Sequence, residues 1–286
     1  MIRRQRHGLS GIGWLLLFPL ALGSLGGAWW WKAASAFPSS RVSFLVVGDP
    51  VMVVTWDQRK QEVFLLSLPA ATRIDATRGY GRYSLDALWK LGDMDGRPGS
   101  VLRESVEDAL GLPIPWYLKP SRSDAAPAGI DFLRQLFSVQ SMWAVLVGAT
   151  RSNIAPPRFL VLAISALFLR ANQVVMVPVQ SAIGTEMLPD GTREPILMPE
   201  RMDSLVGTDF EEAPVRAEGL SVALYNTTDM PTLGQRAARI LSHAGALVVT
   251  VGNDQPVGDG CIVRGKKELL AGATVRFIRR YFGCSV

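Results

Sequence analysis

One uncharged apolar segment near the N-terminus constrains the whole chain. Residues 12–31 read IGWLLLFPLALGSLGGAWWW and contain no charged side chain. A helix rises about 1.5 Å per residue, so this segment is long enough to cross the roughly 30 Å hydrocarbon core of a bilayer. Arg3, Arg4 and Arg6 precede it, and basic residues stay on the cytoplasmic side of a membrane helix. We therefore predict a cytoplasmic tail over residues 1–11, a single transmembrane helix over residues 12–31, and extracytoplasmic domains anchored in the plasma membrane.

A cleaved signal peptide is the alternative interpretation of this segment. Ala34-Ser35-Ala36 follows it as a small-residue site of the A-x-A type. The apolar stretch exceeds the roughly 7–15 residues of a usual signal core, which favours a retained anchor. Two further apolar runs, residues 141–149 and 159–169, are too short to span a bilayer and are interpreted as core elements.

The charge balance argues against a nucleic-acid partner. The formal net charge is +5, from 30 Lys and Arg against 25 Asp and Glu. Three of the arginines lie in the tail, which leaves the rest of the chain close to neutral. Two cysteines and two histidines are too few for a Cys₄ or Cys₂His₂ zinc site. The sequence also lacks a P-loop, a G-x-S-x-G elbow, an H-E-x-x-H helix and a G-x-G-x-x-G turn.

The cysteine pair takes its meaning from the predicted compartment. Cys261 and Cys284 are the chain's two cysteines, and an even pair in an oxidising compartment favours a disulfide. Such a bridge would contribute about 3 kcal/mol by the loop-entropy relation. Two buried free thiols are the alternative.

The hydrophobic pattern divides the exported part into two α/β units. Residues 32–41 are small and polar and are interpreted as a stalk. Residues 42–180 alternate strands with helices, as is typical of a layered α/β domain. Residues 181–217 contain four prolines and predict a less regular connector packed on the first domain, with one short helix over residues 199–206. Residues 218–286 predict a small α/β domain that folds separately.

Hydrophobic periodicity and turn residues predict the individual helices and strands. The first domain is expected to open with strands over residues 42–47, 51–56 and 62–68, the last two antiparallel. Its helices are expected over residues 84–91, 100–110, 131–139 and 157–169, with an edge segment over residues 112–118 and strands over residues 142–147 and 173–179. In the second domain, strands over residues 220–225 and 247–251 flank a helix between Thr232 and Gly245, and a helix over residues 273–281 follows. His243 is expected to be a cap or surface residue.

Two regions of the sequence carry motifs of a known family. Residues 48–54 (GDPVMVV), 67–74 (SLPAATRI) and 101–118, which end in SVEDALGLPIPWYL, resemble the LytR–CpsA–Psr (LCP) proteins of bacterial envelopes. Residues 222–228 (VALYNTT), 233–245 and 249–253 (VTVGN) resemble the LytR C-terminal domain. The resemblance implies attachment of anionic glycopolymers to peptidoglycan from a polyprenyl-diphosphate carrier.

Departures from the family motif decide the predicted function. The family's chemistry needs carboxylates to hold Mg²⁺ and arginines to bind the diphosphate, because negative charge develops on the leaving group. Asp49 matches the first metal-binding Asp, but Ala70 and Ala71 replace the motif's Arg and Asp. We therefore expect a non-catalytic protein without a cofactor. It would bind or scaffold in the assembly of cell-wall glycopolymer and peptidoglycan, with a cell-wall polymer, a polyprenyl-linked glycan or an envelope protein as partner.

Two alternatives remain open. The first is a divergent Mg²⁺-dependent phosphotransferase in which Asp49 holds the metal and acts in catalysis with Arg73, while Arg78 and Arg82 bind the ligand. Without a functional role, Asp49 would be a turn residue and the three arginines would be solvated loop residues. The second alternative is an adaptor whose C-terminal domain alone carries the function.

Overall fold

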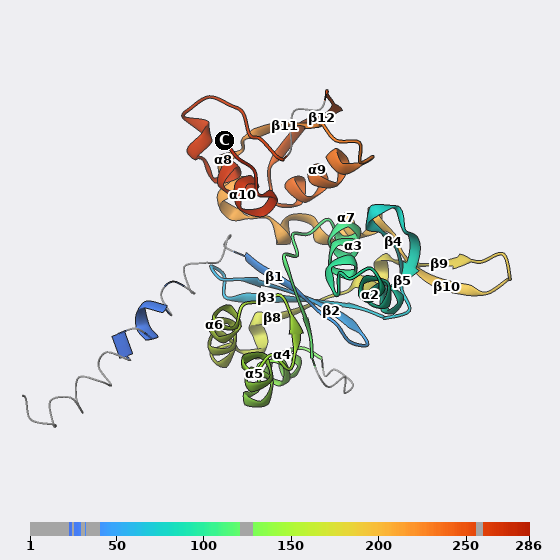
Figure 1. Ribbon diagram of the computed structural model, residues 1–286, viewed down its shortest axis with the longest axis vertical. Coiled ribbons are helices and arrows are strands. Elements are labelled where there is room, and N and C mark those ends of the chain that lie inside the picture. The colour runs from blue at the N-terminus through green and yellow to red at the C-terminus, as the bar shows by residue number, and fades with distance from the viewer. Residues whose placement is uncertain (1–22, 25, 30–31, 33–40, 121–127, 256–259) are drawn as a thin grey trace, which may run out of the picture.

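The computed structural model describes residues 23–24, 26–29, 32, 41–120, 128–255 and 260–286 (Figure 1). Most of the predicted tail, membrane helix and stalk therefore lies outside the described residues. Residues 23–24, 26–29 and 32 are helical. Within the described ranges, no helix is both long enough and apolar enough to cross a membrane.

A six-stranded mixed sheet forms the centre of the first unit. β1 (Arg41–Val46), β2 (Val51–Asp57) and β3 (Glu62–Leu68) make an antiparallel meander, which confirms the strands predicted from the turn residues. β6 (Trp116–Lys119) pairs in parallel with β1, β8 (Val174–Val177) pairs in parallel with β3, and the two-residue β7 (Arg151–Ser152) flanks β6. The order is β7-β6-β1-β2-β3-β8. All residues of β1 and β2 are buried, because both faces of the sheet are covered.

Helices cover the two faces of this sheet (Figure 1). On one face, α2 (Leu85–Met94) and α3 (Ser100–Leu110) share a core with Leu45, Val53 and Leu66. On the other face, α4 (Ile130–Leu136) and α6 (Pro156–Leu167) share a core with Phe44 and Leu65. α5 (Val139–Leu146) packs on α6. Apolar side chains therefore fill the space on both sides of the strands.

A second sheet extends the first unit. Its four strands have the order β5-β4-β10-β9, and consist of β4 (Arg73–Ala76), β5 (Gly81–Ser84), β9 (Ile183–Met187) and β10 (Arg193–Leu197). The β9–β10 hairpin projects from the molecule in Figure 1, and β10 joins β4 in parallel where Ile196 faces Arg73. The expected irregular connector is therefore largely regular structure. Strand pairing across more than 100 residues orders this segment, and local sequence could not show it.

The helix predicted over residues 199–206 is confirmed. α7 (Pro199–Val206) begins with its proline in the first turn, where the missing N–H costs no hydrogen bond. Met202 and Val206 are fully buried in the same core as α3. Short 3₁₀ turns occupy Thr77–Gly79, Ala171–Gln173, Val179–Ala182, Gly207–Phe210 and Leu269–Ala271.

Two element predictions in the first unit are wrong. The buried strand expected over residues 142–147 is α5, because the Ser138 hydroxyl accepts a hydrogen bond from the Ser141 N–H and caps a helix there. Trp143 and Leu146 on this helix are exposed. The segment over residues 112–118 is also not an edge strand. Its prolines precede β6, which pairs with β1 on one side and β7 on the other.

The C-terminal unit is the predicted β-α-β arrangement followed by a helix. β11 (Ser221–Asn226) and β12 (Leu247–Asn253) pair in parallel, and α9 (Leu233–His243) connects them. α8 (Ala213–Glu218) leads into this unit and α10 (Ala273–Phe282) closes it. Val215, Leu241, Phe277 and Ile278 form its core.

Two long-range contacts hold α10 in place. The Glu218 carboxylate accepts hydrogen bonds from the N–H groups of Ala273 and Thr274, the first two residues of the helix. Burial tends to raise the pKa of Glu218, but the bonds from Thr274 and Ala273 outweigh it and lower the pKa. Cys261 and Cys284 form a disulfide with their Cα atoms 4.4 Å apart. The predicted disulfide is therefore confirmed.

Candidate functional site

The residue that matches the family's metal-binding aspartate lies in a surface turn. Asp49 is exposed between β1 and β2. Val51 pairs with Leu68, so Asp49 and Ala70 flank this pair at the same end of the sheet. The structure thus places the two motif segments at the same end of the sheet. Of the three motif positions, only Asp49 keeps the expected residue, because positions 70 and 71 are alanines. Among the described residues, no three His, Cys, Asp or Glu side chains are grouped to hold a metal ion. The residues present do not fit a Mg²⁺ site.

Arg73 and Arg82 are held by carboxylates in the four-stranded sheet. Arg73 lies 2.5 Å from Glu194 of β10 and donates a second hydrogen bond to the Arg82 carbonyl oxygen. The Arg82 Nε lies 3.0 Å from Asp75, and its Nη1 lies 2.8 Å from Glu186 of β9. Hydrogen bonds to Asp75 and Glu186 raise the pKa of Arg82. Both arginines fasten the β9–β10 hairpin to β4 and β5.

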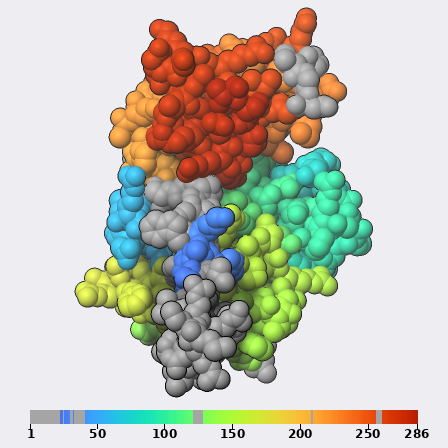
Figure 2. All heavy atoms as spheres, turned by 60° about the vertical axis from the view of Figure 1, so that its left-hand side comes forward, coloured from blue at the N-terminus to red at the C-terminus, as the bar shows by residue number. Residues whose placement is uncertain are grey.

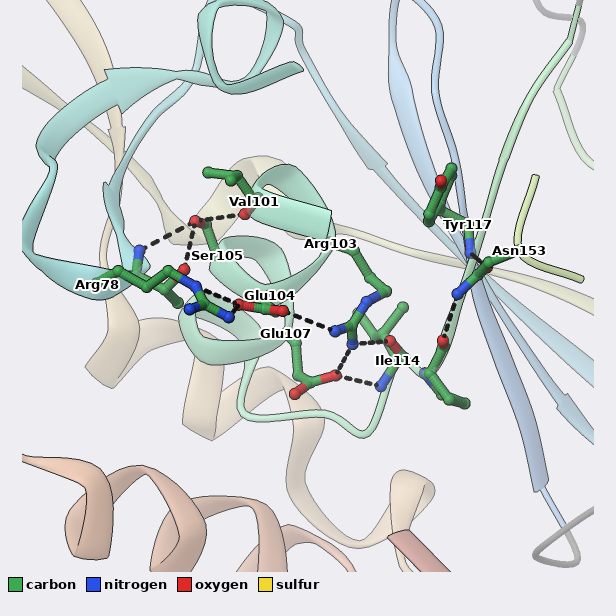
Figure 3. Close-up of polar contacts among 11 residues, drawn as sticks. Arg78, Val101, Arg103, Glu104, Ser105, Glu107, Ile114, Tyr117 and Asn153 are labelled. Carbon is green, nitrogen blue, oxygen red and sulfur yellow. Dashed lines mark hydrogen bonds and ion pairs between the residues drawn. The ribbon is translucent and has the colours of Figure 1, made fainter. Parts of the chain in front are cut away.

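Arg78 belongs to a separate network along α3 (Figure 3). Its Nε and Nη2 lie 3.1 and 3.0 Å from Glu104 Oε2. Arg103 bonds the other oxygen of Glu104 and also Glu107, at 3.3 and 2.9 Å. It further donates to the Ile114 carbonyl oxygen, while the Ile114 N–H donates to Glu107. This network fixes the loop between α3 and β6.

The α3 network continues into the C-terminal unit through Tyr281. The Tyr281 hydroxyl hydrogen-bonds the Glu107 carboxylate. Burial raises the pKa of Glu107, opposed by Arg103 and by this bond. Burial, followed by the charge of Glu107, raises the pKa of Tyr281. Tyr281 therefore stays neutral, and its hydroxyl donates a hydrogen bond to the Glu107 carboxylate in the folded protein.

A second group of contacts joins α9 to the first unit. The surfaces of the C-terminal unit and the first unit meet directly in Figure 2. Arg239 lies at the C-terminal end of α3, where its Nη groups donate to the carbonyl oxygens of Asp108 and Ala109. Its Nε lies 2.7 Å from Asp203 of α7. A cation that caps the last carbonyls of a helix also offsets the negative end of the helix dipole.

His243 belongs to this interface and not to the open surface. Its Nδ1 donates to the Gly111 carbonyl oxygen at 2.9 Å, and its Nε2 lies 3.4 Å from Asp203. Gly111 has a φ of +64°, and a Cβ there would come within 2.6 Å of the imidazole. Glycine is therefore needed both for the left-handed backbone and for the approach of His243. The predicted surface position of His243 is wrong because its neighbours come from a distant part of the chain.

Burial makes His243 a source of pH-dependent stability. Burial lowers its pKa, opposed by the bond to Gly111 and the charge of Asp203. The unfolded chain therefore binds this proton at a higher pH than the folded protein does. The part of the free energy of unfolding that depends on neutral His243 is fully present above pH ~6.5. It is lost as the pH falls through the lower pKa of the folded protein.

We expect His243→Gln to remove part of the acid sensitivity of folding. Urea unfolding at several pH values between 5 and 8 should show a shallower loss of stability below pH ~6.5 for this variant than for the unmodified chain. Identical slopes would show that His243 titrates alike in the folded and unfolded states.

The sequence contains a signal for these interface residues, but an ambiguous one. Arg236, Arg239 and His243 recur at helical spacing beside the apolar stripe of α9. A solvated basic face gives the same pattern. Their partners, Asp108 and Asp203, lie far away in the chain and could not be assigned without the fold.

Comparison with known proteins finds structural similarity over part of the chain. No family model and no curated protein matches the sequence. B. subtilis TagV overlaps 58% of this chain and 93% of its own, with 13% identity and a TM-score of 0.41. The LytR-CPS2A-psr family protein YwtF (TagT) with bound octaprenyl pyrophosphate lipid overlaps 59% and 89%, with 14% identity and a TM-score of 0.40. TagT bound to LI-WTA gives the same coverage and identity, with a TM-score of 0.41. Similarity at this level does not assign the chain to a family.

Proposed function

We propose that this protein is an LCP-like protein of the cell envelope that binds or scaffolds cell-wall material and does not transfer it. Residues 12–31 would anchor it in the plasma membrane. The observation that carries the proposal is the pairing of the three candidate arginines. Arg73, Arg78 and Arg82 are each paired with a carboxylate of this chain. A diphosphate would have to displace these carboxylates before it could use the arginines.

The end of the sheet near Asp49 supports the same proposal. Transfer from a diphosphate needs positive charge to stabilise the leaving group, and the loss of one such group costs several kcal/mol in the transition state. Ala70 and Ala71 supply neither an arginine nor a carboxylate. Both faces of the sheet are also occupied by packed apolar side chains, including Leu66 and Leu65. These features favour binding over chemistry.

The test measures transfer and binding on the same preparation. The full chain, in detergent with Mg²⁺, is given a polyprenyl-diphosphate-linked glycan and peptidoglycan sacculi. We expect no release of polyprenyl phosphate above background, because the three candidate arginines are already paired with carboxylates. We expect the protein to sediment with the sacculi.

Asp49→Ala and Asp190→Ala are the paired variants. Both aspartates are exposed turn residues, and only Asp49 matches the family motif. Turnover that persists in Asp190→Ala and disappears in Asp49→Ala would establish the phosphotransferase alternative. Failure to sediment with sacculi, together with no turnover, would refute the binding proposal and leave the adaptor alternative.

A further inference from the structure

Two helices of the first unit expose an unusual amount of apolar surface. On α5, Val139, Trp143 and Leu146 follow one another at helical spacing, and with Val147, which caps the helix, they are 52–80% exposed. At the end of α6, Leu167 and Phe168 are each 76% exposed. Helix faces that point to solvent are normally polar, and a large exposed apolar patch marks an interaction site. We call these six residues the α5–α6 face.

The sequence segment that contains α5 and α6 carries charge of one sign. From Phe132 to Thr185 the sequence contains four arginines and no acidic residue, although the chain has 25 acidic residues in all. The arginines are Arg134, Arg151, Arg158 and Arg170. Arg134 and Arg151 make exposed ion pairs with Asp131 and Asp93, and such pairs contribute little to stability. Exposed apolar helix residues in a segment whose charged side chains are all arginines suit an anionic lipid surface.

The length of chain before β1 limits how far this unit can lie from a membrane. Nine residues, 32–40, lie between Trp31, the end of the proposed membrane helix, and Arg41, the start of β1, so ten Cα–Cα steps join the two. Fully extended, these ten steps span at most about 36 Å. The first unit would therefore stay within contact distance of the bilayer. This step depends on the proposed membrane anchor.

We infer that the α5–α6 face lies on the anionic surface of the membrane that holds the anchor. Trp143 and Phe168 would enter the interfacial layer, which aromatic side chains favour. An apolar helix face of this kind sits about 5–10 Å into the boundary between headgroups and acyl chains. α5 and α6 lie at the end of the molecule opposite the C-terminal unit (Figure 1). The contact would thus direct the C-terminal unit away from the bilayer.

The test uses single thiols on the full chain. Both native cysteines are in the disulfide, so Trp143→Cys or Phe168→Cys introduces one thiol for a fluorescent label. The labelled chain is reconstituted in nanodiscs of phosphatidylglycerol and phosphatidylethanolamine. Brominated lipid then reports contact with acyl chains, and aqueous iodide reports exposure to water. Val249→Cys is the matched control, because Val249 is apolar and 58% exposed in the C-terminal unit.

The expected result separates the two kinds of site. Labels at positions 143 and 168 should lose most of their fluorescence to brominated lipid and resist iodide, whereas the label at position 249 should do the reverse. Replacing phosphatidylglycerol by phosphatidylcholine should weaken the lipid quenching.

Three outcomes would overturn the inference. Labels at positions 143 and 168 that behave like the control would exclude membrane contact while leaving the anchor intact. Labels shielded from iodide but not quenched by lipid would show that a second copy or another protein covers the face. A chain that does not co-elute with nanodiscs would refute the proposed anchor and this inference together.

Discussion

Arg239→Ala is expected to lower the free energy of unfolding by about 2–4 kcal/mol, because it leaves several partly buried groups without this partner. The Arg239 side chain is 21% exposed and bonds the carbonyl oxygens of Asp108 and Ala109 as well as the Asp203 carboxylate. Burial already raises the pKa of Asp108, opposed by Arg236 and Arg239. Without Arg239, the carboxylates of Asp108 and Asp203 lose a shared positive partner. The C-terminal unit loses its main polar attachment to α3.

Urea unfolding followed by circular dichroism measures this loss, and Arg236→Ala is the matched control. Arg236 lies on the same helix and makes a single ion pair with Asp108 at 3.2 Å, with a third of its side chain exposed. Its removal should cost less than about 1 kcal/mol. Equal losses for the two variants would show that Arg239 acts only as a surface charge. The contacts to the carbonyl oxygens of α3 would then contribute nothing.

Removal of the Cys261–Cys284 disulfide is expected to cost about 3 kcal/mol, because the unfolded chain regains the freedom of a loop of roughly two dozen residues. The two cysteines are 23 positions apart, and Cys284 is buried in the core of the C-terminal unit. The bridge connects the end of α10 to the segment after β12. We expect Cys261→Ser/Cys284→Ser to unfold at a clearly lower urea concentration than the oxidised chain.

Reduction of the unmodified protein provides the control for this double substitution. Dithiothreitol should destabilise the unmodified chain by nearly the same amount and should leave the double variant unchanged. A variant as stable as the oxidised protein would mean that the Glu218 cap and the packing of Phe277 and Ile278 hold α10 in place without the disulfide. Unfolding monitored in the C-terminal unit and in the first unit would show whether the loss spreads across the Arg239 contacts.

The parts of the fold that local sequence determines were predictable. Turn residues separate β1, β2 and β3, and neighbouring strands pair directly. The β-α-β order of the C-terminal unit follows in the same way from Thr232 and Gly245, which bound α9. Short apolar runs were not predictable. Residues 142–147 suit a strand by composition, and only the Ser138 cap with its local hydrogen bond favours the helix.

Pairing between distant segments accounts for most of the remaining differences. β10 contains Pro195, which disfavours a central strand, yet it lies between β4 and β9. The ladder tolerates it because β10 meets β4 at one residue pair, Ile196 and Arg73. The carboxylates that neutralise Arg73 and Arg82 come from this hairpin. Sequence alone could place these arginines near the motif, but it could not show that they were already paired.

The burial of β1, β2 and β3 on both faces has a consequence for synthesis. These three strands leave the ribosome first, but β8, which pairs with β3, follows about 110 residues after its partner. At roughly 5–20 residues per second, that interval lasts on the order of ten seconds. During it the meander has two apolar faces and no helices to cover the second one, since α4 and α6 also come late. A nascent chain of this design depends on chaperones until its covering helices have been made.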